Sequence, residues 1–108
     1  MSSVPPVVLT FAASDPTGGA GLQADVLTLA ALGCHPLSVL TAPTVQDTRG
    51  VERVRAVESS WVAAQARALL ADIKVDAFKL GVLGSAENVR AIAELVSDHA
   101  QVPLVLDP

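Results

Sequence analysis

The chain has 108 residues, of which 51% are hydrophobic, 17% charged and 3% aromatic, so it forms one domain or part of one around small aliphatic side chains. Its formal net charge of −4 is spread along the sequence, which argues against nucleic acid and anionic membranes as partners. The single cysteine excludes an intrachain disulfide and a cysteine-rich zinc site, and we expect a reducing, cytoplasmic environment.

Short apolar runs alternate with amphipathic segments in the first half of the chain. Residues 7–11 are apolar on both faces, as in a buried parallel strand. Residues 19–32 carry apolar side chains at helical spacing, and Gly33 supplies the stop. A second strand is expected over residues 37–44, where Pro43 makes the far end an edge or extended segment.

The middle of the chain predicts a flap and a second helix. Residues 51–57 alternate as in a strand with one wet face, and residues 41–57 together predict a small flap off the main sheet. Ser59 or Ser60 is expected to cap the helix that follows. One face of that helix is expected to pack on the sheet through Val62, Ala66, Leu69 and Ile73.

The last third predicts a strand over residues 77–80, a helix capped by Ser85, and a strand over residues 103–106. The inner side of this helix is expected to consist of Val89, Ile92, Ala93 and Val96. The alternation predicts right-handed βαβ units in a doubly wound or three-layer α/β fold. A parallel strand finishing in Asp107-Pro108 normally feeds another loop and helix, so we expect the N-terminal part of a longer protein.

The glycine-rich residues 15–25 (DPTGGAGLQAD) join the first strand to the first helix, where open α/β sheets bind ligands. No Gly-Lys-Ser/Thr follows, so this is not a P-loop, and the glycine spacing does not match a dinucleotide fingerprint. Asp25 lies four residues after Gly21, on the same helix face, where a carboxylate would face a ligand over the loop. A tight strand-to-helix turn without a ligand is the alternative.

Other candidates lie at neighbouring strand ends. Gln46 offers a donor and an acceptor that match a nitrogen heterocycle, or it is a turn residue in water. Val82, between Gly81 and Gly84, offers an apolar wall, or the glycines only make a turn. Asp107 is placed to reach a magnesium ion through water, although aspartate often ends a strand.

Several motifs, in this order and spacing, closely resemble the hydroxymethylpyrimidine/phosphomethylpyrimidine kinases of thiamine biosynthesis, which are ribokinase-like enzymes. They are residues 14–25 (SDPTGGAGLQAD), 31–33 (ALG), 38–42 (SVLTA), 46–51 (QDTRGV), 79–85 (KLGVLGS) and 105–108 (VLDP). The resemblance implies a three-layer α/β/α sandwich with a mostly parallel central sheet, of which residues 1–108 are the N-terminal part of a single kinase domain.

The resemblance implies that this chain carries the pyrimidine-binding half of an enzyme that uses ATP and Mg²⁺. The implied pocket residues are Ala20, Gly21, Asp25, Thr44, Gln46 and Val82. Two departures alter the pocket wall: Val82 stands where methionine is common, and residues 43–45 read Pro-Thr-Val where Leu-Val-Ala is typical.

In that family the catalytic residue and most of the ATP site lie in the C-terminal half, so we expect no catalytic residue here and no kinase activity from the isolated chain. The relatives pair through the flap, which implies a homodimer. Two alternatives remain: a stand-alone module that binds a small heterocycle, and a pyridoxal or sugar kinase of the same superfamily.

Overall fold

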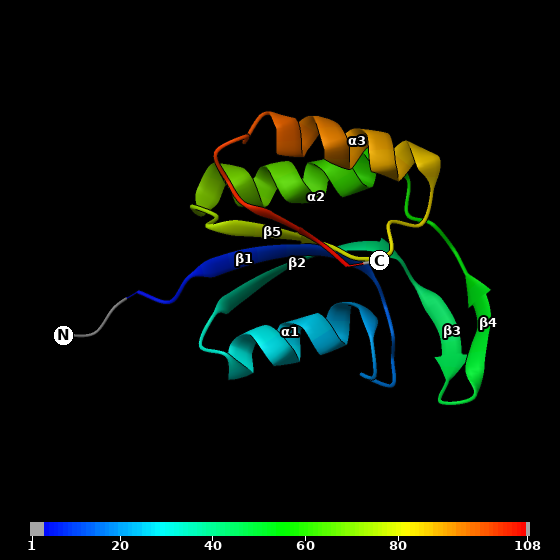
Figure 1. Ribbon diagram of the computed structural model, residues 1–108. Coiled ribbons are helices and arrows are strands. Elements are labelled where there is room, and N and C mark those ends of the chain that lie inside the picture. Colours follow the sequence, from blue (N-terminus) through cyan, green and yellow to red (C-terminus); the bar gives the residue numbers. More distant parts are fainter. Residues whose placement is uncertain (1–3, 108) are drawn as a thin grey trace.

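The computed structural model describes residues 4–107, so Pro108 of the final motif lies outside the described residues. Figure 1 shows a sheet with helices on both faces. The elements in chain order are β1 (Val7–Ala13), α1 (Gly21–Ala31), β2 (His35–Ala42), β3 (Thr44–Asp47), β4 (Gly50–Val54), α2 (Ser59–Asp72), β5 (Ala77–Leu80), α3 (Ala86–Ser97) and β6 (Leu104–Leu106).

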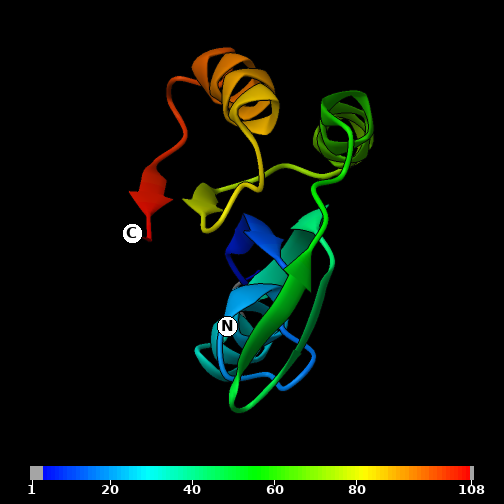
Figure 2. The ribbon, with the colours of Figure 1, turned by 90° about the vertical axis from the view of Figure 1, so that its right-hand side faces the viewer.

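The central sheet has the strand order β2-β1-β5-β6, and every neighbouring pair is parallel. Helix α1 covers one face, while α2 and α3 cover the other, as the end-on view in Figure 2 shows. The chain therefore changes side of the sheet after β2, so that β1 and β5 lie next to each other with crossovers on opposite faces. Ligands bind at such switch points in open α/β sheets.

Side chains of β1 alternate between the two faces, as the pleat of a strand requires. Leu9 and Phe11 are fully buried in the apolar core beneath α2 and α3. Thr10, also fully buried, lies on the α1 side, where its hydroxyl donates to Asp25. Thr10 thus brings one buried hydroxyl to the face of β1 that α1 covers.

The predicted flap is confirmed: β3 and β4 form a separate antiparallel hairpin outside the main sheet. Pro43 divides it from β2, because the strand predicted over residues 37–44 ends at Ala42. The expectation of one wet face for the second flap strand is wrong, since all five residues of β4 are exposed. Figure 1 shows the hairpin projecting away from the three layers, and on β3 only Thr44 and Gln46 are half-buried.

Two helix predictions need correction. Helix α1 begins at Gly21 and not at residue 19, because Gly18 has a positive φ of 77° and Ala20 is an extended N-cap. In α3 the expected inner residues Val89 and Ala93 are exposed. The buried side of α3 consists of Asn88, Ile92 and Leu95.

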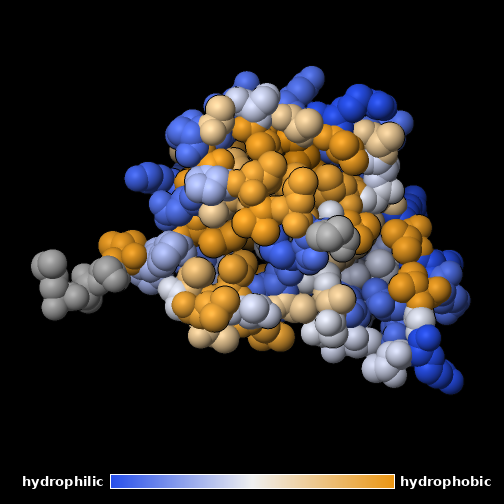
Figure 3. Space-filling model, viewed as in Figure 1, coloured by the Kyte–Doolittle hydropathy of each residue, from blue (hydrophilic) through white to orange (hydrophobic). Residues whose placement is uncertain are grey.

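The predicted inner face of α2 is confirmed: Val62 and Ala66 are buried, and Ile73 is half-buried at the end of the same face. The expected cap is wrong, because Ser59 and Ser60 lie inside the helix and the N-cap residue is Glu58, whose side chain makes no capping hydrogen bond. Exposed apolar side chains gather on the face that carries β6, and Figure 3 shows them as a hydrophobic patch. All three residues of β6 are exposed. No helix within residues 4–107 has the length and hydropathy needed to cross a membrane.

Candidate functional site

A cavity of about 370 Å³ opens at the carboxyl ends of β1 and β5, between the glycine loop and the flap. It brings together residues from β1, α1, β3, β4, β5 and the segment after β6. All of the predicted pocket and metal residues line it: Ala20, Gly21, Asp25, Thr44, Gln46, Val82 and Asp107. Their placement in one cavity makes them a candidate binding site, and their roles in binding remain predictions.

The glycine loop is held from within by Asp15, which is buried. Its Oδ1 accepts from the backbone N–H and the hydroxyl of Thr17, and its Oδ2 accepts from the N–H of Ala20. The hydrogen bond from the Thr17 hydroxyl, with those from the loop amides, holds the pKa of Asp15 below its ordinary value. The carboxylate therefore occupies the loop amides that a bound anion would otherwise use.

Gly21 allows the loop to pass close to the end of β1. Its φ is +66°, and a Cβ there would lie 2.6 Å from the carbonyl oxygen of Ala13. A side chain at this position would meet the backbone, so only glycine fits without movement. This close approach seats the start of α1 directly against the cavity.

The flap is attached to β1 through Ser14, which the sequence motifs include but whose contacts they do not reveal. The Ser14 hydroxyl accepts from the N–H of Thr44, and the Thr44 hydroxyl donates to the Ser14 carbonyl oxygen at 2.9 Å. Gln46 then donates from Nε2 to the same carbonyl at 3.1 Å and to the Thr44 hydroxyl at 2.7 Å. Gln46 is thus a positioned side chain and not a turn residue in water.

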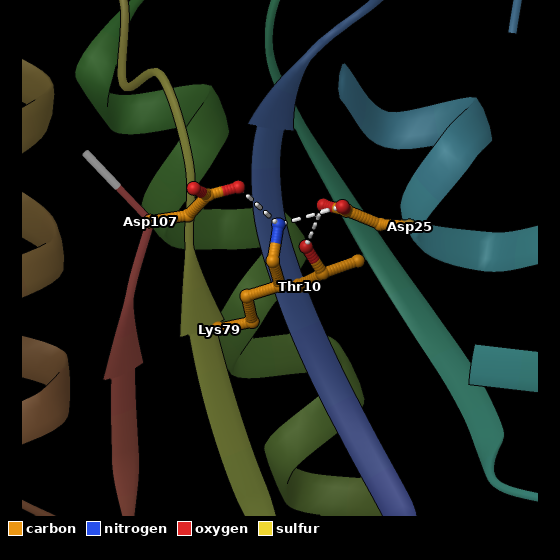
Figure 4. A network of polar contacts seen from close by, with 4 residues as sticks. All are labelled: Thr10, Asp25, Lys79 and Asp107. Carbon is orange, nitrogen blue, oxygen red and sulfur yellow. Dashed lines mark hydrogen bonds and ion pairs between the residues drawn. The ribbon is translucent and has the colours of Figure 1, made fainter. Parts of the chain in front are cut away.

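The floor of the cavity carries a polar network that Figure 4 shows from close by. Asp25 accepts from the Thr10 hydroxyl through Oδ2 at 2.7 Å and from Lys79 Nζ through Oδ1 at 2.6 Å. Lys79 Nζ also contacts Oδ2 of Asp107 at 3.2 Å. The expected ligand-facing carboxylate of Asp25 therefore lines the cavity with both oxygens already paired to protein.

Lys79 interrupts an apolar strand, which indicated an unidentified carboxylate partner, and the structure supplies two. Burial acts to lower the pKa of Lys79, but the hydrogen bonds and charges of Asp25 and Asp107 outweigh it and raise the pKa above the ordinary value. The ammonium form is therefore held at physiological pH. These two carboxylate partners were not predictable, because they depend on the register of three strands and on where α1 packs against the sheet.

Asp107 fits a supporting role toward Mg²⁺. Its side chain is 59% exposed, and only Oδ2 has a hydrogen-bond partner among residues 4–107. Within that part of the chain, no group of three or more His, Cys, Asp or Glu side chains is arranged to hold a metal ion. Mg²⁺ is commonly held by one or two carboxylates together with waters and substrate phosphates, which matches a single available carboxylate oxygen.

The same residues do not fit a triphosphate. Lys79 is the cationic side chain that lines the cavity, and it is already paired with two carboxylates. The amides of Thr17, Gly18 and Ala20 are bonded to Asp15 within the loop. The cavity therefore suits a small, largely neutral ligand better than a polyanion.

A model of the phosphomethylpyrimidine kinase family matches residues 15–108, which include every element that lines the cavity except β1. The chain belongs to this family. A hydroxymethylpyrimidine/phosphomethylpyrimidine kinase from Streptomyces coelicolor is 50% identical over 104 residues, which are 96% of this chain and 38% of the relative. The chain thus spans well under half the length of this curated relative.

Solved structures agree with the phosphomethylpyrimidine kinase assignment. A phosphomethylpyrimidine kinase from Clostridium difficile 630 superposes with a TM-score of 0.88 at 39% identity, over 95% of this chain and 45% of that one. A pyridoxal kinase from Staphylococcus aureus in complex with pyridoxal gives a TM-score of 0.84 at 31% identity, over 98% of this chain and 40% of that one. These likenesses confirm the predicted ribokinase-like α/β fold.

Proposed function

We propose that the protein containing this chain phosphorylates the hydroxymethyl group of 4-amino-5-hydroxymethyl-2-methylpyrimidine, and then its monophosphate, with Mg-ATP, as a step of thiamine biosynthesis. The chain supplies the acceptor side of the site as the N-terminal part of a single kinase domain. The fixed orientation of the Gln46 carboxamide carries this proposal.

The partners of Gln46 decide which of its atoms remains for a ligand. A carbonyl oxygen only accepts, so the atom of Gln46 that faces Ser14 must be the nitrogen. The Thr44 hydroxyl gives its hydrogen to the same carbonyl and so accepts the second N–H of Gln46. Oε1 is left as an acceptor, which complements the exocyclic amine of an aminopyrimidine.

The donor side of the reaction is proposed to come from the part of the kinase that the relatives have beyond the matched region. Phosphoryl transfer needs a cradle for the β- and γ-phosphates and a group placed at the acceptor hydroxyl. The cavity-lining residues offer no such cradle, while Asp107 offers one carboxylate oxygen toward the metal. Bound Mg²⁺ would neutralise charge on the transferred phosphate.

A pyridoxal kinase is the second candidate, since a pyridoxal kinase shares the fold closely. Pyridoxal carries a ring hydroxyl in place of an exocyclic amine, so it offers Gln46 Oε1 one donor hydrogen where the aminopyrimidine offers two. The test is a phosphorylation panel with the full-length product of the reading frame that encodes this chain. We expect the aminopyrimidine to be phosphorylated with the highest kcat/KM. Faster phosphorylation of pyridoxal or a sugar would overturn the proposal in favour of that kinase.

The isolated 108-residue chain is expected to show no kinase activity in the same assay. Binding of the pyrimidine without phosphorylation by either form would favour a stand-alone binding module.

We also propose a cytoplasmic homodimer that pairs through the flap. Support comes from the exposed apolar side chains of the hairpin, Val45, Val51 and Val54, because a two-stranded ribbon is marginally stable alone. Sedimentation of the full-length protein and of Val45→Asp tests the dimer.

A further inference from the structure

We propose that Lys79 is a positioning residue, whose ammonium group is anchored on Asp25 and holds the carboxylate of Asp107 at the rim of the cavity for a metal ion. The inference deepens the proposed kinase function and rests on it for the identity of the metal-bound ligand. The coupling between Lys79 and Asp107 is a separate claim that does not require the enzyme to be a pyrimidine kinase.

Strand register places these groups on one face of the sheet. Thr10 of β1 and Lys79 of β5 are register partners, and Lys79 is paired with Val105 of β6. Asp107 lies two residues beyond Val105, so the pleat returns its side chain to the same face. Helix α1 packs over this face and adds Asp25 (Figure 4).

The ammonium group of Lys79 is held mainly by Asp25, which is the more buried of its two carboxylate partners. Thr10 is fully buried, and the side chain of Asp25 is only 11% exposed. Removing the ammonium from Asp25 would leave a buried carboxylate with one hydrogen bond, which is strongly unfavourable. Lys79 therefore stays on Asp25, at 2.6 Å, and extends its charge outward to Asp107 at 3.2 Å.

Asp107 is held by little else. It follows β6, whose three residues are all exposed, and its backbone N–H bonds to the carbonyl oxygen of Leu80 at 2.9 Å. Lys79 is the hydrogen-bond partner of its side chain within residues 4–107. Without that contact the exposed carboxylate would sample several rotamers. With it, Oδ2 is fixed and Oδ1 remains available for a metal-bound water.

The test is a double-mutant cycle in the full-length protein, with binding of Mn²⁺ in the presence of AMP-PCP measured by electron paramagnetic resonance. Asp107→Asn removes the ligand, and Lys79→Met removes the ammonium while keeping the length of the side chain. Each single change is expected to weaken Mn²⁺ binding by about tenfold, as for other groups that orient metal ligands. The double variant should bind Mn²⁺ no more weakly than Asp107→Asn alone, because both changes act through one carboxylate.

Lys74→Met is the matched control, since Lys74 is exposed and does not line the cavity. It should leave Mn²⁺ binding unchanged, and Lys79→Arg should restore part of the affinity lost in Lys79→Met. Unchanged Mn²⁺ affinity in Lys79→Met, or losses that multiply in the double variant, would overturn the inference. A merely structural ion pair would lower stability without this non-additivity.

A second measurement does not depend on the folding of Lys79→Met. The side-chain ammonium of Lys79 is observed by ¹H–¹⁵N NMR in the otherwise unchanged protein and in Asp107→Asn. We expect its resonance to shift in Asp107→Asn, and an unshifted resonance would contradict the coupling. If the wild-type protein fails to phosphorylate the pyrimidine while the NMR coupling is present, the proposed function fails and the positioning of Asp107 stands.

Discussion

Gln46 Nε2 lies 3.1 Å from the carbonyl oxygen of Ser14, so a side chain of the flap is tied to the end of the central strand. Gln46→Ala removes this tie and the acceptor oxygen that remains for a ligand. We expect pyrimidine binding to the full-length protein to weaken by about 1 to 3 kcal/mol, the usual effect of leaving a buried polar group without its partner. Isothermal calorimetry measures this directly.

Gln101→Ala is the control for the loss of a glutamine, because Gln101 is exposed and does not line the cavity. It should bind the pyrimidine as the wild type does. An affinity of Gln46→Ala equal to that of the control would remove Gln46 from the site.

Thr44→Val tests whether the orientation of Gln46 matters as well as its presence. The valine keeps the shape of threonine but loses the hydroxyl that accepts from Gln46 at 2.7 Å and donates to the Ser14 carbonyl oxygen at 2.9 Å. We expect a loss of about 1 kcal/mol in pyrimidine affinity, the net value of one hydrogen bond. In the Gln46→Ala background the same change should have no further effect, and an additive loss would show that Thr44 acts independently.

Gly21→Ala is expected to destabilise the protein more than Gly18→Ala. Both glycines have positive φ, which for alanine costs about 1 to 2 kcal/mol. A Cβ at Gly18 meets no atom within 4 Å, whereas at Gly21 it would lie 2.6 Å from the carbonyl oxygen of Ala13. Urea unfolding of the two variants should therefore give a clearly lower midpoint for Gly21→Ala, and equal midpoints would contradict the close approach.

The lowered pKa of Asp15 predicts that the stability contributed by the glycine loop falls at acidic pH. Because its pKa is lowered in the folded protein, Asp15 stabilises the fold above the ordinary carboxylate pKa of 3.8. That contribution is lost as the pH falls from there through the lowered pKa. Asp15→Asn should flatten the dependence of the unfolding free energy on pH in this acidic window, as measured by denaturant titrations. Asp72→Asn, at an exposed position of α2, should keep the wild-type slope.

The layers of this fold were predictable because apolar residues repeat with the period of each element. Residues 7–11 and 77–80 are short, mostly apolar runs, which predicts buried strands, and Pro43 marks the change from the sheet to the flap. The inner face of α3 was mispredicted because Asn88 is polar. Its side-chain amide donates to the carbonyl oxygen of Leu83 in the preceding loop and to that of Thr41, which is 47 residues away in sequence.

The members of the candidate site were also predictable, because motifs at strand ends converge on one edge of a parallel sheet. The hydrogen bonds and ion pairs between these residues were not predictable. The pairing of Lys79 with Asp25 and Asp107 depends on strand register, and the bonds of the glycine loop depend on the rotamer of Asp15. Such contacts are set by three-dimensional packing, which a single sequence does not record.

The change of side between α1 and α2 means that the two walls of the cavity belong to different crossovers of the chain. The glycine loop is part of the first crossover, and the flap is part of the second. A ligand that touches both acts as a removable cross-link between them, and at a concentration 100 times its Kd it adds about 2.7 kcal/mol to the unfolding free energy. Thermal shift is therefore an assay for ligands of this cavity even where no phosphate is transferred.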